Sequence, residues 1–245
     1  MIKLSLSACP AELTPQREQE LIDRFKSSGA PVWRQTYIKE SLLQMSYGKC
    51  AYSEVRLEEE GKYTEIEHFR CKSKYPDLVV RWGNLLPSSK VCNAKKGELD
   101  VAVAPIVNPL IDEPRDHLYV EAYRFYPKTE VGRNTIEHVA LNDRKEFANR
   151  RGEECQYLER AFLNWSRAMA GGHDDQHWVC EAKAKLSSCD ERSAYSAVIA
   201  TYILYESEAY RRLKKILQER GYWDSDFYQI EAMLERLALP KPKED

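Results

Sequence analysis

Residues 65–97 read EIEHFRCKSKYPDLVVRWGNLLPSSKVCNAKKG, and this stretch decides how the rest of the chain is interpreted. An acidic residue and a histidine are adjacent in Glu67-His68, and the asparagines Asn84 and Asn93 follow them. A carboxylate and a carboxamide can bind one divalent cation, and an imidazole with its ordinary pKa of about 6.5 can take a proton from water. The stretch therefore carries the side chains that a one-metal nuclease needs to hydrolyse a phosphodiester.

The same stretch is rich in positive charge, although the whole chain has a net charge of −2. A local positive field in a nearly neutral protein is typical of a phosphate-binding surface. Contacts of this kind tolerate any base sequence and weaken as salt is added. We expect five of its basic side chains to hold the nucleic-acid backbone: Arg70, Lys72, Lys74, Lys95 and Lys96.

The order of secondary structure around these residues predicts a ββα unit. Residues 50–68 alternate as a β-hairpin with Gly61 in its turn, and His68 ends the second strand. Residues 69–88 contain proline and glycine and predict a loop. Ser88 or Ser89 then caps a short helix that ends at Gly97.

Helices are expected on both sides of this unit, so we predict a mostly helical α+β fold. Thr14-Pro15 predicts the start of a helix, and a proline-rich connection with one strand or hairpin follows the ββα unit. The expected helices cover about 15–28, 32–47, 135–168, 174–188, 190–220 and 224–237, with the hairpin at 118–125. The expected domains are an N-terminal helical segment (1–47), a nuclease unit (48–100) and a connecting segment with a helical region for partner docking (101–245).

Composition excludes several classes of protein. A chain of 245 residues is long enough to bury a sizeable core, and no run of eighteen apolar residues could span a membrane. The N-terminus lacks the apolar region of a secretory signal. Seven cysteines form an odd, irregularly spaced set, which is typical of reduced thiols rather than a disulfide framework. We therefore expect a cytoplasmic protein.

The stretch resembles the HNH, or ββα-metal, nuclease family. The matching pieces are Glu67-His68, Asn84-Leu85 and Cys92-Asn93-Ala94-Lys95-Lys96-Gly97. The resemblance implies that Glu67 and Asn93 are metal ligands, that His68 is the general base and that Asn84 braces the catalytic loop. Oxygen ligands favour a hard cation, so the expected metal is Mg²⁺ or Mn²⁺.

A wider resemblance extends to about residue 151 and points to the PtuB family of HNH subunits in Septu antiphage systems, some of which are attached to retrons. It is carried by Gly48-Lys49-Cys50-Ala51-Tyr52, His68-Phe69-x-x-Lys72-Ser73, Trp82-x-Asn84-Leu85, Asn108-Pro109, Thr135-Ile136 and Leu141-Asn142. The resemblance implies an effector that cleaves nucleic acid beside an ABC-type ATPase of the PtuA kind. In retron systems it also implies a reverse transcriptase and its RNA–DNA hybrid as partners.

Many HNH proteins hold a structural zinc with two CxxC pairs, and this chain keeps only half of each pair. The four positions are Cys50, Ser53, Ser89 and Cys92. A neutral hydroxyl is a poor zinc ligand, and structural sites need four nitrogen or sulfur donors. We therefore expect no structural zinc.

Two other functions stay open. The motif recognises a phosphate and not a sugar, so RNA, for example tRNA, is an alternative substrate to DNA. The lost zinc ligands favour a second alternative, a catalytically idle subunit that binds nucleic acid as a scaffold. The other histidines are interpreted as structural or surface residues: His117, His138, His173 and His177. If His68 is the base, cleavage should fall below about pH 6.5.

Overall fold

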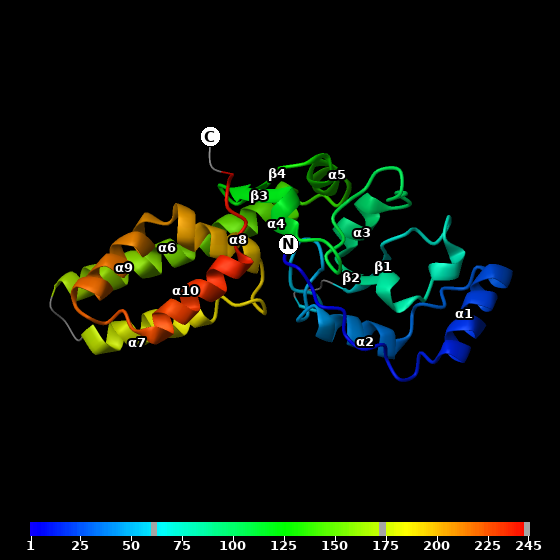
Figure 1. The fold of residues 1–245 in the computed structure, drawn as a ribbon, viewed down its shortest axis with the longest axis horizontal. Coiled ribbons are helices and arrows are strands. Elements are labelled where there is room, and N and C mark those ends of the chain that lie inside the picture. The colour runs from blue at the N-terminus through cyan, green and yellow to red at the C-terminus, as the bar shows by residue number, and fades with distance from the viewer. Residues whose placement is uncertain (60–62, 172–174, 243–245) are drawn as a thin grey trace. The chain divides into compact units, whose positions relative to one another are not determined.

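The computed structural model describes residues 1–59, 63–171 and 175–242 (Figure 1). The described residues form a mostly helical α+β chain with two small antiparallel sheets, which confirms the expected fold class. The chain divides into two compact units, one of residues 1–118 and 126–141 and one of residues 119–125 and 142–245. The predicted domain boundaries at 48 and 101 stay a prediction, and the predicted turn at Gly61 and the positions of Gly172 and His173 lie outside the described residues.

The first unit begins with two helices. The Thr14 side chain accepts a hydrogen bond from the backbone N–H of Arg17, and Gly29 ends the helix in the left-handed region with φ 68°, so α1 has the predicted bounds. The second helix is shorter than the expected range of 32–47, since it begins at Thr36 and ends at Met45. The elements of this unit are α1 (Pro15–Ser28), α2 (Thr36–Met45), β1 (Glu65–His68), η1 (Pro76–Leu78), η2 (Trp82–Asn84), β2 (Leu85–Ser88), α3 (Lys90–Lys96), α4 (Pro114–His117) and α5 (Glu130–His138).

The predicted hairpin of residues 50–68 is wrong. Residues 50–57 form a compact, buried turn with Glu54 at a positive φ of 61°, so they do not extend into a strand beside β1. Strand β1 pairs instead with β2, with Glu67 opposite Leu86 and His68 opposite Leu85. The ββα order is present, but the long loop lies between the strands rather than after them.

Helix α3 forms as the sequence predicts. The Ser89 hydroxyl accepts from the backbone N–H of Cys92, and Gly97 ends the helix at a φ of 51°. The helix packs against β1. Its buried side chains are Cys92 and Lys96, which are four residues apart, so one face of this short helix packs into the interior.

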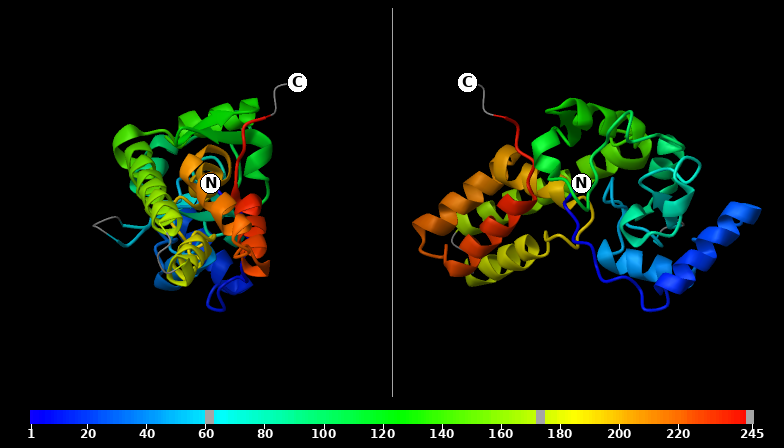
Figure 2. Two further views of the ribbon diagram at one scale, coloured as in Figure 1. Left: turned by 90° about the vertical axis from the view of Figure 1, so that its left-hand side faces the viewer. Right: turned by 45° about the vertical axis from the view of Figure 1, so that its right-hand side comes forward.

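The second unit is a helical bundle in which α6 packs against α7, α8 and α9 (Figure 2). The predicted hairpin at 118–125 is confirmed as the pair β3–β4, although it ends two residues later. The long predicted helices are interrupted where Ala140 and Tyr195 adopt positive φ angles and where the Ser207 hydroxyl caps a new helix. The strands β3 (Leu118–Glu121) and β4 (Arg124–Pro127) include residues of both units. The other elements of the second unit are η3 (Arg144–Ala148), α6 (Asn149–Ala170), α7 (Asp175–Ser187), α8 (Ser196–Thr201), η4 (Tyr202–Glu206), α9 (Glu208–Glu219) and α10 (Ser225–Leu237).

None of the helices in the described residues is both long enough and apolar enough to cross a lipid bilayer.

Candidate active site

Strand β1 distributes its side chains to two sides, as the pleat of a strand requires. Glu65 and Glu67 contact helix α3, whereas His68 contacts the loop between the strands. All three residues line one cavity of about 520 Å³, together with Asn93 from the first turns of α3. The structure thus brings the sequence-predicted base and both predicted metal ligands to one place.

The His68 ring is fixed in a single orientation. Its Nε2 lies 2.9 Å from the backbone oxygen of Val79, and its ring meets Trp33 edge to face at 5.0 Å between centroids. Because a carbonyl oxygen only accepts, Nε2 carries the hydrogen and Nδ1 carries the lone pair. Burial lowers the pKa of His68 from 6.5 to about 4, so the ring is neutral at physiological pH.

This pKa bears on the expected pH dependence of cleavage, which stays a prediction. A base with an ordinary pKa would lose its function below about pH 6.5, but His68 has to be protonated against the cost of burying an imidazolium ion. The ring therefore keeps its free lone pair at pH values well below that limit.

Asn84 closes the loop that carries the His68 partner. Its Nδ2 donates to the backbone oxygens of Arg70 at 3.1 Å and Leu78 at 3.0 Å, and its Oδ1 accepts from the N–H of Arg70 at 2.8 Å. Leu78 precedes Val79, whose oxygen holds Nε2 of His68. One buried carboxamide at the end of the loop thereby holds both its start, at Arg70, and the part that carries Val79.

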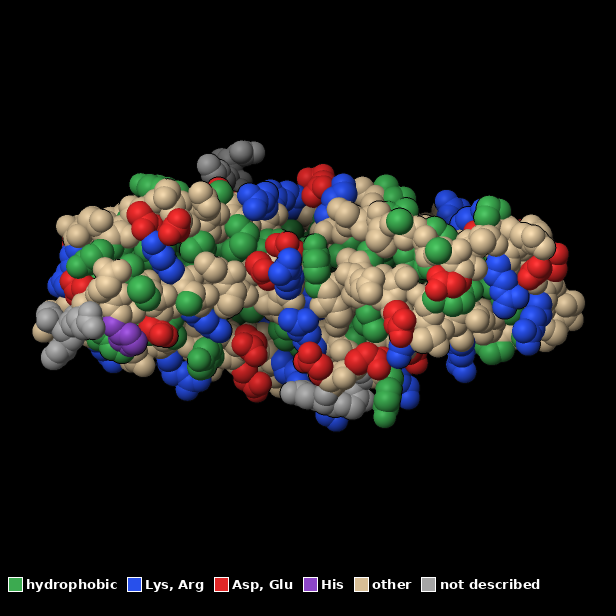
Figure 3. All heavy atoms as spheres, turned by 90° about the horizontal axis from the view of Figure 1, so that it is seen from below, with side chains coloured by type: hydrophobic (Ala, Val, Ile, Leu, Met, Phe, Trp, Pro, Cys, Tyr) green, Lys and Arg blue, Asp and Glu red, His purple; other side chains and the backbone are tan. Residues whose placement is uncertain are grey.

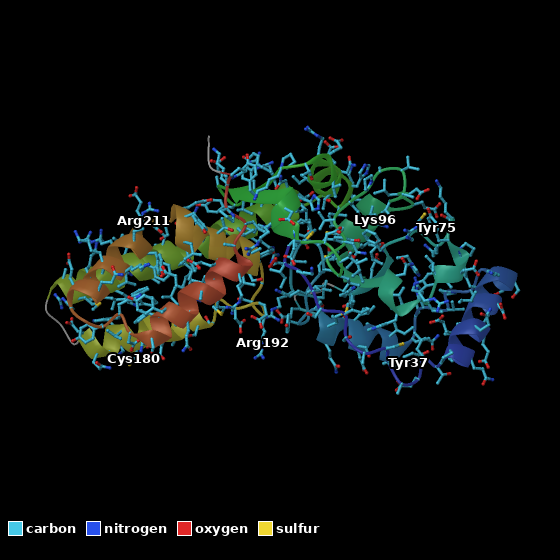
Figure 4. All side chains as sticks on the ribbon, viewed as in Figure 1. Tyr37, Tyr75, Lys96, Cys180, Arg192 and Arg211 are labelled. Atoms are coloured by element: carbon cyan, nitrogen blue, oxygen red, sulfur yellow. The ribbon has the colours of Figure 1, made fainter. Side chains whose placement is uncertain are left out.

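Glu67 is held by a buried cation. Nζ of Lys96 lies 2.6 Å from Oε1 of Glu67 and donates to the backbone oxygen of His68 at 2.9 Å. Burial raises the pKa of Glu67, and the ammonium of Lys96 opposes that effect. The expectation that Lys96 binds a phosphate is wrong, because its side chain is buried and paired with Glu67. Figure 4 labels Lys96 on α3.

Glu65 is a site residue that the sequence reasoning missed. Its Oε2 accepts a hydrogen bond from Nδ2 of Asn93, and both residues line the cavity. The signal was present in the order Glu65-Ile66-Glu67, since residues two apart in a strand share a side. The sequence analysis paired this strand with the segment before it, and it therefore did not predict that Glu65 contacts α3.

The residues at the cavity fit a hard divalent cation by ligand type. Glu67 and Asn93 supply oxygen donors from two adjacent elements, the donors that Mg²⁺ and Mn²⁺ prefer, and Glu65 lies beside Asn93. The ammonium of Lys96 already neutralises one of these carboxylates. Across the part of the chain that the structure describes, no group of three or more His, Cys, Asp or Glu side chains is arranged to hold a metal.

The other predicted phosphate contacts are dispersed. Lys72 lines the cavity, and its ammonium lies 5.3 Å from the centroid of the Trp33 ring. Arg70 lies over the Tyr75 ring, Lys74 pairs with an aspartate, and Lys95 is exposed. Figure 3 shows one face of the molecule, on which positive and negative side chains are interspersed. Two cavity cations that sequence reasoning did not select come from the segment before α2 and from α2 itself: Arg34 and Lys39.

The four degenerate zinc positions meet in one buried cluster. Sγ of Cys50 is hydrogen-bonded to Oγ of Ser88 at 3.8 Å. Cys92, Ser53 and Ser89 lie close enough to the Cys50 thiol to shift its pKa, and the two serines do the same for Cys92. Burial alone would raise the pKa of Cys50, but the neighbouring polar groups of Cys92, Ser53 and Ser89 lower it well below its ordinary value. Two thiols and two hydroxyls therefore stand at the four positions that hold thiolates in HNH proteins with a structural zinc.

Comparison with known proteins gives a relative over nearly the full chain. Over 250 residues the chain is 34% identical to the Septu protein PtuB of Bacillus thuringiensis, and the match covers 99% of this chain and 96% of that protein. No protein-family model matches the chain.

Proposed function

The chain belongs to the Septu PtuB family, and on that premise we propose that it is the nuclease subunit of an antiphage defence complex. It is an endonuclease of the HNH type, which hydrolyses phosphodiester bonds of nucleic acid with one divalent cation. Its partner is an ABC-type ATPase of the PtuA kind, and in a retron system a reverse transcriptase with its RNA–DNA hybrid joins them.

The observation that carries this proposal is the state of His68 beside Glu67 and Asn93. A general base needs a free lone pair, and Nδ1 has one because Nε2–H is committed to Val79. The ring is neutral because burial lowers its pKa to about 4. The same cavity holds the two side chains that supply oxygen ligands.

Four residues of the cavity have roles in the proposed hydrolysis. His68 takes a proton from the attacking water at Nδ1, and the Val79 oxygen keeps the imidazolium ring in place through Nε2–H. Glu67 and Asn93 would hold the cation. When bound, the cation supplies Lewis-acid stabilisation of the phosphate and of the departing 3′-oxygen. Lys72 lies at the same cavity and offers its ammonium to the substrate backbone.

The test is a cleavage assay with the complex purified together with its genomic partners. His68→Ala should reduce cleavage in Mg²⁺ or Mn²⁺ by at least about a hundredfold, since general bases contribute about 10²–10⁴-fold. His138→Ala removes a histidine from α5 and serves as the matched control. Undiminished cleavage by His68→Ala would contradict the mechanism in which His68 is the general base. Because phosphate chemistry is common to DNA and RNA, both nucleic acids, tRNA included, are sequenced after activation.

The buried pair of Lys96 and Glu67 favours a second candidate, a subunit that binds nucleic acid without cutting it. An internal ammonium 2.6 Å from a proposed metal ligand competes with a cation for that carboxylate. Retained binding without cleavage in Mg²⁺, Mn²⁺, Ca²⁺ or Zn²⁺ would establish this candidate and exclude the first.

A further inference from the structure

We infer that Glu65 is a positioning residue that orients the Asn93 carboxamide, so that Oδ1 of Asn93 faces the cation. This inference rests on the proposed function, because it assigns a partner to one of the proposed metal ligands. Nothing in the HNH-like motif of Glu67, His68, Asn84 and Asn93 requires an acid at position 65.

The two residues are brought together by the packing of β1 on α3. Glu65 begins β1, opposite Ser88 of the neighbouring strand, and Asn93 lies four residues after the helix cap Ser89. The strand and the helix make two successive contacts, from Glu65 to Asn93 and from Glu67 to Lys96. The spacing matches, because residues two apart in a strand and three apart in a helix each share a side.

The chemistry of the contact decides which end of the amide faces the metal. A carboxylate has only acceptor oxygens, so Glu65 can bind the nitrogen end of Asn93 and not its oxygen end. The terminal torsion of asparagine is broad and roughly two-fold, so an unrestrained amide would exchange its two ends. A hydrogen bond at Nδ2 directs Oδ1 away from Glu65, so that Oδ1 would be available to a cation that Glu67 would also hold.

The contact is not needed to hold the fold together. Glu65 is only partly buried, and the strand pairing at its position is made by the backbone. Helix α3 is anchored independently by the Ser89 cap and by the buried Lys96. Replacing the Glu65 side chain should therefore disturb the amide and leave the ββα unit folded.

The test measures Mn²⁺ affinity calorimetrically on the purified chain without nucleic acid, so it does not depend on cleavage. Glu65→Ala should weaken Mn²⁺ binding by about 10–100-fold, the usual effect of removing a group that orients a metal ligand. Glu65→Gln should stay within about threefold of the unmodified chain, because its side-chain oxygen accepts the same hydrogen bond. Glu98→Ala is the charge control, since Glu98 is exposed at the same cavity.

The affinities of these variants test the role of Glu65 and the proposed metal site separately. Equal losses in Glu65→Ala and Glu65→Gln would overturn the inference, because Glu65 would then act through its charge as a ligand. Unchanged affinity in Glu65→Ala would overturn it too. Asn93→Ala separates this inference from the proposed function: if Asn93→Ala weakens binding and Glu65→Ala does not, only the inference fails. Unchanged affinity in Asn93→Ala would remove the proposed metal site and the inference together.

Discussion

The ammonium of Lys96 lies 2.6 Å from Oε1 of Glu67, and both side chains are almost fully excluded from water. The same ammonium donates to the backbone oxygen of His68, so one cation joins helix α3 to the two central residues of the motif. Lys96 and its neighbour Lys95 are identical in charge and adjacent in sequence, yet Lys95 is exposed. This contrast gives a matched pair of substitutions.

We predict that Lys96→Met destabilises the fold by about 3 kcal/mol, because it leaves the buried carboxylate of Glu67 without its countercharge. Lys95→Met should change stability by less than about 0.5 kcal/mol, as is usual for an exposed position. Urea denaturation in EDTA at pH 7 measures both. The double variant Glu67→Gln with Lys96→Met should recover part of the loss, since no charge is then left buried. Equal stability of the two single variants would show that the buried pair is not formed.

The depressed pKa of His68 predicts a pH dependence of stability. The unfolded chain binds this proton below about pH 6.5, whereas the folded chain binds it only near pH 4. The unfolded state therefore holds more protons between these values, and the free energy of unfolding falls as the pH is lowered from 6.5 to 4. A shift of this size corresponds to about 3 kcal/mol.

The measurement compares the unmodified chain with His68→Gln by denaturation at pH 7, 5.5 and 4.5 in EDTA. Other groups titrate alike in both proteins, so the difference isolates His68. The unmodified chain should lose more stability than the variant on acidification. Parallel curves would mean that the ring is accessible to protons in the folded protein.

The three hydrogen bonds of Asn84 predict a local effect on His68. Asn84→Asp keeps the acceptor for the Arg70 N–H but cannot donate to the two backbone oxygens, so it should cost about 2–3 kcal/mol. The loosened loop should then admit water to His68, and the pKa of its ring should rise towards its ordinary value, because burial is the largest cause that lowers it. A titration of the His68 ring followed by NMR checks this, with His138 as the internal reference. An unmoved His68 titration would show that the loop is held without Asn84.

The cluster around Cys50 predicts that zinc binding can be restored by design. Ser53→Cys combined with Ser89→Cys supplies four thiols at positions that already converge. The double variant should bind one zinc ion with tetrahedral thiolate ligation and gain thermal stability from it. Elemental analysis and cobalt substitution, with its visible absorption bands, measure the result. Cys155 and Cys189 lie in the second unit and remain as internal thiol controls. Failure to bind cobalt would mean that the four side chains do not share a centre.

Local features were predictable from the sequence because nearby residues encode them. The Thr14 cap and Gly29 give α1, and Ser89 and Gly97 give α3, since hydrogen bonds to the first turn and a left-handed terminus depend on a few adjacent residues. The alternation that ends at His68 likewise placed the histidine at a strand end. Membership of the Septu PtuB family was expected from the short motifs between residues 48 and 142, and it is shown by a relative that covers 99% of this chain.

Tertiary structure alone decided what these residues contact. The partner of β1 is β2 rather than the preceding segment, because strand pairing depends on which distant surfaces meet. The same packing joined Glu65 to Asn93, buried Lys96 against Glu67 and placed Trp33 against His68. The burial of these side chains and their pKa values depend on the folded interior, because segments remote in sequence exclude water from it. The sequence by itself determined the chemical groups of the site, and the fold determined their pairing and their charge.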